Sequence, residues 1–588
     1  MLLRLSTSLL LLLYGSNALL AASVREPAKE TYHESLRLTP FPDGKVLSRF
    51  NFTLHGQWDP EGQRLGTNTV AHHHTLLPRL LTSLIRQFRV PDFHLTLSSG
   101  RWQSTWPPHL PAAIPPNGIE LTAWLELLEG ETLDEERNRW QAFTGAVGGL
   151  FCAGIASENV HALTDSPTWG FAFDGEGDER EHRFYRTVMP RLAAACTESL
   201  APFLSLLPCA SHAGLSSLLN PHRLFDGEWT LLDVKVVYAE VSGELRVDLG
   251  IGSVQDPVRK DRLSGQLGRR EFSLSSLYDR TFTTACPVAT SSIIELVVPS
   301  HSVNQFVIEP DIAKEMKHEG ELDLAVWDAN KALEIAALDV RLTWPGENPF
   351  RYPHPSKLPL SPISTRRLSF GVGQERGRIG VEITNNLDRE AEVVWVETWP
   401  WWLRGFVSTL NATVAGGTGA GTSTDIILTD LSYTPSIART RPTTLQALLR
   451  LAPKSITQLT LAHESASLWY TEYPSDSNRG FSVPGALIVL LSPSSSQDAK
   501  VSATLPPALI PAPGQPGFLT SRSPLLRLHT STTLISLPLP DFSMPYNVII
   551  LTSTVAALFF GSVMNGLVRG WFVVDLEEDE EGEKGKEQ

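Results

Sequence analysis

The chain has 588 residues, of which 42% are hydrophobic and 19% are charged, and its formal net charge is -15 at pH 7. Such a chain can bury a hydrophobic core, and its acidic balance excludes the basic surface that a nucleic-acid-binding protein needs. The 42 Pro and 42 Gly residues favour strands and turns over long helices.

The N-terminal segment 1–22 has the layout of a cleavable secretory signal. The basic residue Arg4 precedes apolar runs, and small residues stand near the end of the segment, at Ala21, Ala22 and Ser23. We therefore expect the mature chain to enter the lumen of the secretory pathway. An uncleaved signal anchor is the alternative interpretation of the same pattern.

The lumenal part is too long for one hydrophobic core, since it holds roughly 520 residues and single cores stop growing at about 250–300. We expect a mixed α/β domain at 23–225, where strand-like runs alternate with helical patterns at 75–88 and 121–143. A β-rich domain is expected at 226–345. The strand-like runs of these two domains are 34–39, 93–97, 233–238 and 295–298.

A Pro-rich linker is predicted at 346–366, and residues 367–540 have the alternating pattern of an antiparallel β-sandwich. The alternating runs are 379–384, 391–395 and 455–461, and the Gly/Thr-rich stretch 416–424 is predicted to be a long loop. The predicted fold class is therefore α+β to mainly β. It combines a mixed α/β N-terminal domain, antiparallel sandwich-like domains and one C-terminal transmembrane helix.

The transmembrane helix is predicted at 548–568, because this apolar run holds no charged residue. At about 1.5 Å per residue it reaches roughly 31 Å, the thickness of a bilayer's hydrocarbon core. Pro538, Pro540 and Pro545 are expected to fix its start at the lumenal border, because proline is unfavourable inside a helix. The acidic tail 569–588 is then cytosolic, which makes the chain a single-pass type I membrane protein.

Four cysteines lie in the predicted lumenal part, where an oxidising environment normally pairs them. They allow three complete intrachain pairings, and an intermolecular bond is a further alternative. Cys196 and Cys209 stand close enough in the sequence to close a small loop. No CxxC pair or zinc spacing is present, which argues against a thiol oxidoreductase or a zinc module. The four are Cys152, Cys196, Cys209 and Cys286.

Several polar clusters invite chemical interpretations that other features do not support. The run His72-His73-His74 could bind a metal, but adjacent side chains diverge, and the acidic stretch 174–181 lacks the EF-hand register. Both are interpreted as polar loops. The chain has no GxSxG, HExxH, P-loop or GxGxxG motif. We therefore predict no catalytic residue, no metal site and no cofactor.

Two glycosylation sequons are present in the lumenal part, at Asn51 and Asn411. The run 398–403 contains Trp399, Trp401 and Trp402 around a proline. These tryptophans are expected either to pack in the core of the sandwich or to form a surface that meets a partner or the membrane interface.

Seven short segments are spread along the chain: 97–102, 116–121, 149–152, 196–200, 206–215, 469–474 and 540–547. They resemble the PIG-T family, whose members are subunits of the glycosylphosphatidylinositol (GPI) transamidase complex. Their order, together with the signal and the terminal helix, makes the resemblance specific. Family members often carry Asn after the Cys-Thr-Glu motif, but Ser199 stands there in this chain and removes that sequon.

The resemblance implies a non-catalytic scaffold in the endoplasmic reticulum membrane that holds a protease-like catalytic subunit. It also implies that Cys196 forms an intermolecular disulfide to that subunit, that Cys209 pairs with Cys286, and that Cys152 is buried and free. The GPI lipid and the proprotein substrate would be met only through the complex. Functions from other classes are a lumenal hydrolase with an unrecognised Ser/His/Asp set and a lectin-like cargo receptor.

The predicted topology can be tested by protease protection. In intact microsomes that contain the full chain, added protease should remove only the C-terminal tail, because the ectodomain lies in the lumen. Detergent-opened microsomes serve as the control, in which the ectodomain becomes accessible. Digestion of the ectodomain in intact microsomes would show that the orientation is wrong.

Overall fold

A computed structural model describes the chain from residue 30 onwards, with gaps. The described residues are 30–58, 76–106, 114–155, 162–169, 171, 180–190, 194–263, 265, 268–299, 305–319, 322–347, 349–354, 360–371, 375–416, 428–473, 477–492, 524–539, 543–570 and 572. The predicted signal 1–22, the histidine run, residues 174–179 of the acidic stretch and nearly all of the acidic tail therefore lie outside the described residues. The same holds for most of the predicted loop 416–424.

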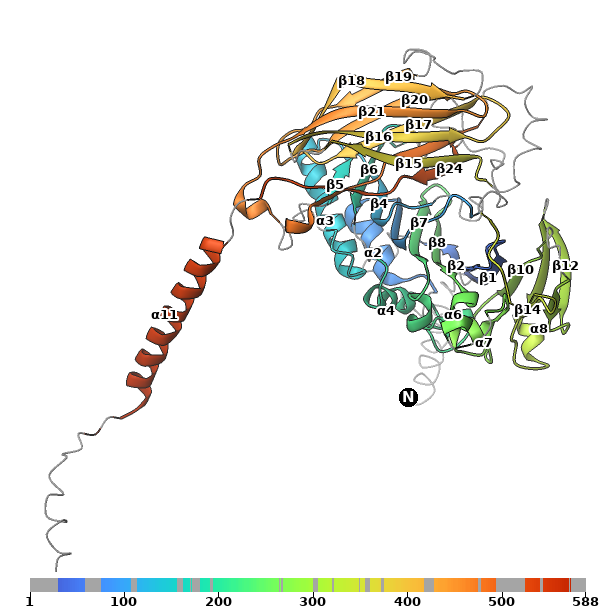
Figure 1. Cartoon of the computed structure of the whole chain (residues 1–588). Coiled ribbons are helices and arrows are strands. Elements are labelled where there is room, and N and C mark those ends of the chain that lie inside the picture. Colours follow the sequence, from blue (N-terminus) through green and yellow to red (C-terminus); the bar gives the residue numbers. More distant parts are fainter. Residues whose placement is uncertain are drawn as a thin grey trace, which may run out of the picture.

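An 11-stranded sheet forms the centre of the first half of the chain (Figure 1). Its strand order is β12-β13-β10-β1-β2-β8-β7-β3-β4-β6-β5, and all pairings are antiparallel except that of β1 with β10. The strands are β1 Thr31–Pro40, β2 Val46–Gln57, β3 Asp92–Gly100, β4 Gly118–Glu126, β5 Leu163–Asp165, β6 His182–Met189, β7 Trp229–Ala239, β8 Glu244–Gln255, β10 Ser291–Val297, β12 Lys314–Glu319 and β13 Leu322–Asp328.

Helices cover one face of this sheet and bury its apolar side chains. Phe143 of α3 packs against Phe88 of α2 and Phe93 of β3, with ring centroids 5.7 and 5.5 Å apart. Because side chains alternate along a strand, the other face carries polar residues and is called the open face here. The helices are α2 Arg79–Phe88, α3 Leu133–Leu150, α4 Thr197–Ser205, α5 Pro221–Leu224, α6 Pro257–Leu263, α7 Leu274–Tyr278 and α8 Ala329–Leu333.

The expected strand runs lie in β1, β3, β7 and β10, but the helical pattern at 121–143 was partly wrong. Its first residues form strand β4, which ends at Glu126, and Gly130 adopts a positive φ of 80° in the following turn. Helix α3 starts only after Thr132, whose side chain and Glu135 form a capping box. The local turn and cap therefore override the helical spacing of the apolar residues before them.

The sheet does not divide at residue 225 or 226, where a domain boundary was expected. Strands β7, β8 and β10 follow that point in the sequence, yet they pair with β3, β2 and β1. One hydrophobic core contains residues from both sides, among them Phe93 and Val234. A small sheet flanks this hydrophobic core. Its strands are β9 Phe272–Ser273, β11 Val307–Glu309 and β14 Arg341–Thr343.

A β-sandwich forms the second half of the ectodomain, as predicted (Figure 1). One sheet has the order β15-β16-β21-β18 and the other β19-β20-β17-β23-β24. Strand β15 begins at Ile363, so the end of the predicted linker belongs to the sandwich. The strands are β15 Ile363–Phe370, β16 Arg376–Asn385, β17 Ala391–Trp399, β18 Leu403–Ala415, β19 Leu428–Thr434, β20 Thr443–Leu451, β21 Ile456–Ser465, β22 Phe481–Val483, β23 Leu487–Leu491, β24 Pro524–His529 and β25 Thr533–Ile535.

Two tryptophans of the run pack in the core, which is the first of the two expected roles. Trp399 and Trp402 are buried in the core of the sandwich. The Nε1 group of Trp399 donates to the carboxylate of Glu397, 3.0 Å away, which satisfies its polar atom. Trp401 is only partly buried and lies at the surface.

The sandwich packs on the open face of the large sheet. Trp124 of β4 and Phe184 of β6 contact an apolar patch on the outer side of the five-stranded sheet, so the two halves share a hydrophobic cluster. The patch consists of Val394, Val396, Leu487, Val489 and Leu491. The amide oxygen of Gln446 also accepts hydrogen bonds from the backbone N–H groups of Thr168 and Trp169, both at 3.0 Å.

Helix α11, Ser543–Val568, projects from the ectodomain (Figure 1). Within it, Tyr546–Val568 is long and apolar enough to cross a membrane, and it is the one such helix among the described residues. The helix begins before the predicted start at 548, with Pro545 in its first turn. Proline is tolerated there because the first backbone N–H groups of a helix have no intrahelical partner.

Candidate functional site

A cleft lies where the sandwich meets the open face of the large sheet. It is a cavity of about 360 Å³, lined by charged side chains of both signs from β1, β2, β3, β4, β7 and β24. Arg49 of β2 reaches Asp233 of β7 at 2.7 Å, and Arg37 of β1 reaches Glu295 of β10 at 2.6 Å. These two arginines of the open face are thus each paired with a carboxylate of the same face.

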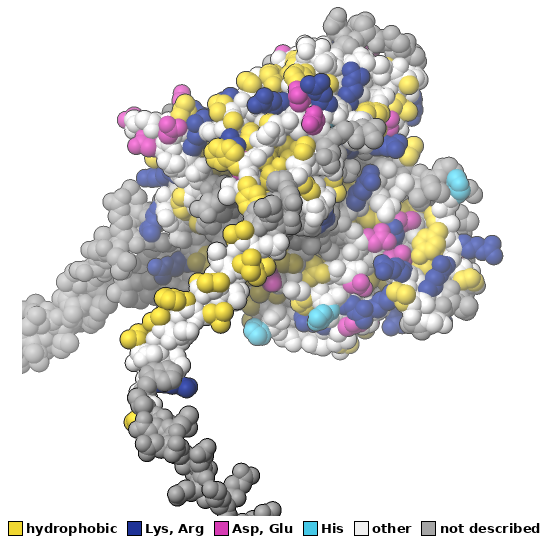
Figure 2. Space-filling view, turned by 60° about the vertical axis from the view of Figure 1, so that its left-hand side comes forward, with side chains coloured by type: hydrophobic (Ala, Val, Ile, Leu, Met, Phe, Trp, Pro, Cys, Tyr) yellow, Lys and Arg dark blue, Asp and Glu magenta, His cyan; other side chains and the backbone are white. Residues whose placement is uncertain are grey.

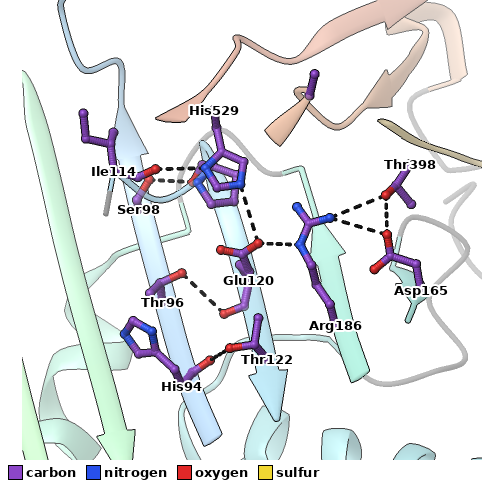
Figure 3. Close-up of polar contacts among 12 residues, drawn as sticks. His94, Thr96, Ser98, Ile114, Glu120, Thr122, Asp165, Arg186, Thr398 and His529 are labelled. Atoms are coloured by element: carbon purple, nitrogen blue, oxygen red, sulfur yellow. Dashed lines mark hydrogen bonds and ion pairs between the residues drawn. The ribbon is translucent and has the colours of Figure 1, made fainter. Parts of the chain in front are cut away.

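A buried ion network at one side of this cleft joins the two halves of the molecule (Figure 3). Arg186 of β6 is only 2% exposed, and its Nε donates to the carboxylate of Glu120 at 2.6 Å. Its Nη1 lies 3.4 Å from Asp165, which also accepts a hydrogen bond from the hydroxyl of Thr398 in the sandwich. Arg186 therefore contacts two carboxylates at the interface.

His529 of the sandwich adds a second link to the same network. Its Nδ1 donates to the backbone carbonyl of Ile114 at 2.9 Å, and its Nε2 lies 3.6 Å from the carboxylate of Glu120 (Figure 3). When protonated, the ring adds positive charge beside Glu120. The link binds strand β24 to the chain segment that precedes β4.

The two carboxylates of the network have opposite pKa shifts. Burial acts to raise the pKa of Glu120, but the charges of Arg186 and His529 outweigh it and hold that pKa below its usual value. Burial raises the pKa of Asp165, and Arg186 only partly offsets this effect. Glu120 is therefore the partner whose ionised form contributes stability at neutral pH.

The described residues do not bring together a complete hydrolytic triad in their hydrogen bonds. The closest arrangement is His33 of β1, whose Nδ1 lies 2.7 Å from the hydroxyl of Ser291 in β10. No carboxylate is hydrogen-bonded to that imidazole among the residues that the structure describes, so the ring lacks an orienting group. Within the same residues no group of His, Cys, Asp and Glu could hold a metal ion.

Cys196 stands at the N-terminal cap of α4 and has a free, partly exposed thiol. Its Sγ contacts the hydroxyl of Ser199 at 3.4 Å and makes no cap hydrogen bond to the helix. Leu200 and Phe203 on the inner side of α4 are buried in the core of the large domain. The helix therefore holds the thiol in a fixed place at the surface.

Cys209 and Cys286 form a disulfide, the pairing that the family resemblance implies. It connects the turn after α4 to the segment that leads into β10, so Cys209 does not close a loop with Cys196. Cys152 is free but exposed, and the expectation that it is buried was wrong. It follows the end of α3 with a positive φ of 53°, which turns its side chain away from the buried Phe151.

Both sequons lie on exposed strand positions. Asn51 points from β2 to the open face beside the cleft, where its side-chain oxygen accepts a hydrogen bond from Arg49 at 3.0 Å. Asn411 is exposed on β18, which is the edge strand of its sheet. Their glycosylation stays a prediction.

The comparison with known families covers nearly the whole chain. The model of the Gpi16 family, described as the Gpi16 subunit, a GPI transamidase component, matches residues 16–266 and 263–588. The chain belongs to the Gpi16 family. This result confirms the resemblance that the sequence segments carried.

Curated relatives of this Gpi16 family chain agree with the match. The chain is 31% identical to the GPI-anchor transamidase component PIGT of Mus musculus, over 96% of this chain and 94% of the mouse protein. It is 27% identical to the GPI transamidase component GPI16 of Saccharomyces cerevisiae, over 97% and 93% of the two chains. A GH20 exo-β-N-acetylglucosaminidase of Vibrio harveyi gives a TM-score of 0.14 over 31% of this chain and 19% of the enzyme, too low to carry any argument.

Sequence reasoning missed the network around Arg186. The sequence of β6 does hold a signal for the network: Arg186 is a charged residue within a strand whose neighbouring residues are buried. A charge at such a position requires a buried partner. Its partners come from distant segments, so no spacing in the sequence identifies them.

The network predicts a large effect of Arg186→Met on stability. The variant leaves Glu120 and Asp165 buried without their cation, so the free energy of unfolding should fall by about 3–5 kcal/mol. Urea unfolding of the full chain in detergent measures this. The loss should shrink as the pH is lowered from about 7 towards about 4, because protonation of the two buried carboxylates removes the unpaired charges in the variant. The wild type keeps the stability contributed by ionised Glu120 over this range, since the lowered pKa of Glu120 delays that loss to pH values below the usual carboxyl pKa.

Arg376→Met is the matched control, since Arg376 and Glu464 form an exposed pair. Its effect should stay within about 0.5 kcal/mol. Equal losses in the two variants would contradict the role assigned to Arg186.

Proposed function

We propose that this chain is a non-catalytic scaffold subunit of a GPI transamidase complex in the endoplasmic reticulum membrane. The observation that carries the proposal is the match to the Gpi16 family and to transamidase components along nearly the full chain. The chain would stabilise and position a protease-like catalytic subunit on the lumenal side. GPI lipid and proprotein would contact it only through the complex.

The anatomy of the chain supports a scaffold. Two domains dock on each other through a shared hydrophobic cluster and a buried ion network, which presents a broad rigid surface. A single helix, α11, anchors this body at one end. In the cleft, Arg49 pairs with Asp233, and Glu120 pairs with the buried Arg186. The described residues offer no nucleophile with both a base and an orienting group.

Cys196 is the residue that we propose to bind the catalytic subunit covalently. Its thiol is partly exposed and fixed by α4, and Cys209, its neighbour in the sequence, is already bonded to Cys286. An intermolecular disulfide raises the effective concentration of the two subunits, while a broad non-covalent interface holds them together without it.

The covalent link predicts a change on a non-reducing gel. Cys196→Ser should remove a heavy, reductant-sensitive band that contains this chain and the catalytic subunit. Attachment of anchors should fall only partly, because non-covalent contacts remain. Thermal unfolding of the ectodomain should be unchanged, since the thiol makes only one 3.4 Å contact with Ser199.

Cys152→Ser is the matched control, because Cys152 is the other free cysteine. The heavy band should persist in that variant. The assignment fails where the band survives in Cys196→Ser and disappears in Cys152→Ser.

A further inference from the structure

An aromatic cluster lies at the surface of the sandwich. It is not part of the hydrophobic core, and it has no part in the disulfide proposed for Cys196. Trp469 is 62% exposed and Tyr470 is 45% exposed, at the start of a short 3₁₀ turn, Tyr470–Glu472. Exposure of a large aromatic side chain costs hydrophobic free energy unless another surface covers it. We call Trp401, Arg439, Trp469, Tyr470 and Glu472 the aromatic-arginine cluster.

The cluster is built rigidly. The guanidinium of Arg439 lies 3.6 Å from the ring centroid of Trp469 and 4.6 Å from that of Trp401. Glu472 pairs with Arg439 through both carboxylate oxygens, and it also accepts the backbone N–H of Trp469 at 2.6 Å. The exposed rings are therefore held in one arrangement by cation–π contacts and a two-point ion pair.

The chain itself places this cluster beside the start of the membrane helix. The hydroxyl of Tyr473 donates to the backbone carbonyl of Pro538 at 2.8 Å, and its ring packs on buried Phe481 of the sandwich. Only a short segment separates Pro538 from Tyr546, the first residue of the span in α11. At about 3.3–3.6 Å per residue it cannot carry the helix end more than roughly 30 Å away.

We propose that the aromatic-arginine cluster docks on the phospholipid headgroup region of the leaflet in which α11 begins. Trp and Tyr favour that depth because their rings are apolar and their N–H and O–H groups reach water. Figure 2 shows hydrophobic side chains along α11 and on the part of the ectodomain from which it projects. Leu539, which lies between the sandwich and α11 in the sequence, is also exposed. The inference rests on α11 crossing a membrane and does not depend on Cys196.

The pairing inside the cluster defines the lipid chemistry. Because Arg439 is neutralised by Glu472, the cluster carries no net charge and needs no anionic lipid. A zwitterionic phosphatidylcholine surface is therefore sufficient. With α11, the cluster gives the ectodomain a second contact with the membrane, which fixes its tilt and the height of Cys196 above the bilayer.

Site-specific photo-cross-linking tests the proposal on the full chain. A photoreactive benzoylphenylalanine replaces Trp469 or Tyr470 in separate variants, which are placed in phosphatidylcholine nanodiscs, irradiated and analysed by mass spectrometry. Both positions should give phospholipid adducts at least fivefold above the same probe at Ile335. Ile335 is 67% exposed and follows α8, on the opposite side of the ectodomain from α11 (Figure 1).

Each other outcome overturns the proposal. Lipid adducts at Trp469 and Tyr470 no higher than at Ile335 place the cluster away from the bilayer. In the assembled complex, adducts to another subunit with none to lipid make the cluster a protein-docking surface. A probe at Tyr546 tests whether α11 lies in the bilayer. If this probe does not react with lipid, α11 does not cross the membrane there, and the inference loses its basis. None of these results bears on whether the chain joins the complex through Cys196.

Discussion

The docking of the sandwich on the open face of the large sheet is the interaction on which the rest of the structure depends. Arg186 stands at its centre, because a buried guanidinium between Glu120 and Asp165 is stable only while both carboxylates stay in place. Thr398 of the sandwich donates to one of those carboxylates. Separation of the two halves would thus expose apolar surface and leave buried polar groups without partners.

This docking has a direct consequence for the scaffold role that we propose. With two domains joined into one body, the Cys196 thiol and the sandwich from which the chain leads to α11 belong to the same framework. The disulfide between Cys209 and Cys286 adds a covalent tie close to α4, on the helical side of the large sheet. A scaffold of the kind that we propose would align its partners through the geometry of this framework.

The sequence predicts the local elements much better than their assembly. Alternation of apolar residues locates strands such as β7 and β16, and the absence of charge locates α11, because these signals are contained in one segment. The boundary at 225 and 226 was wrong because pairing of β7 and β8 with earlier strands is a long-range choice. The exposure of Cys152 depends on a left-handed backbone turn after α3. The partners of Arg186 come from β4, β5 and the sandwich, and residue order does not reveal such contacts.

The claim that this chain is a scaffold of a transamidase is tested most directly by affinity purification of the tagged full chain from gently solubilised membranes, with quantitative mass spectrometry. The account predicts a protease-like subunit and further membrane subunits in fixed stoichiometry, and no transamidase activity of the chain purified alone. Recovery of the chain without a protease-like subunit, or anchor attachment by the isolated chain, would contradict it.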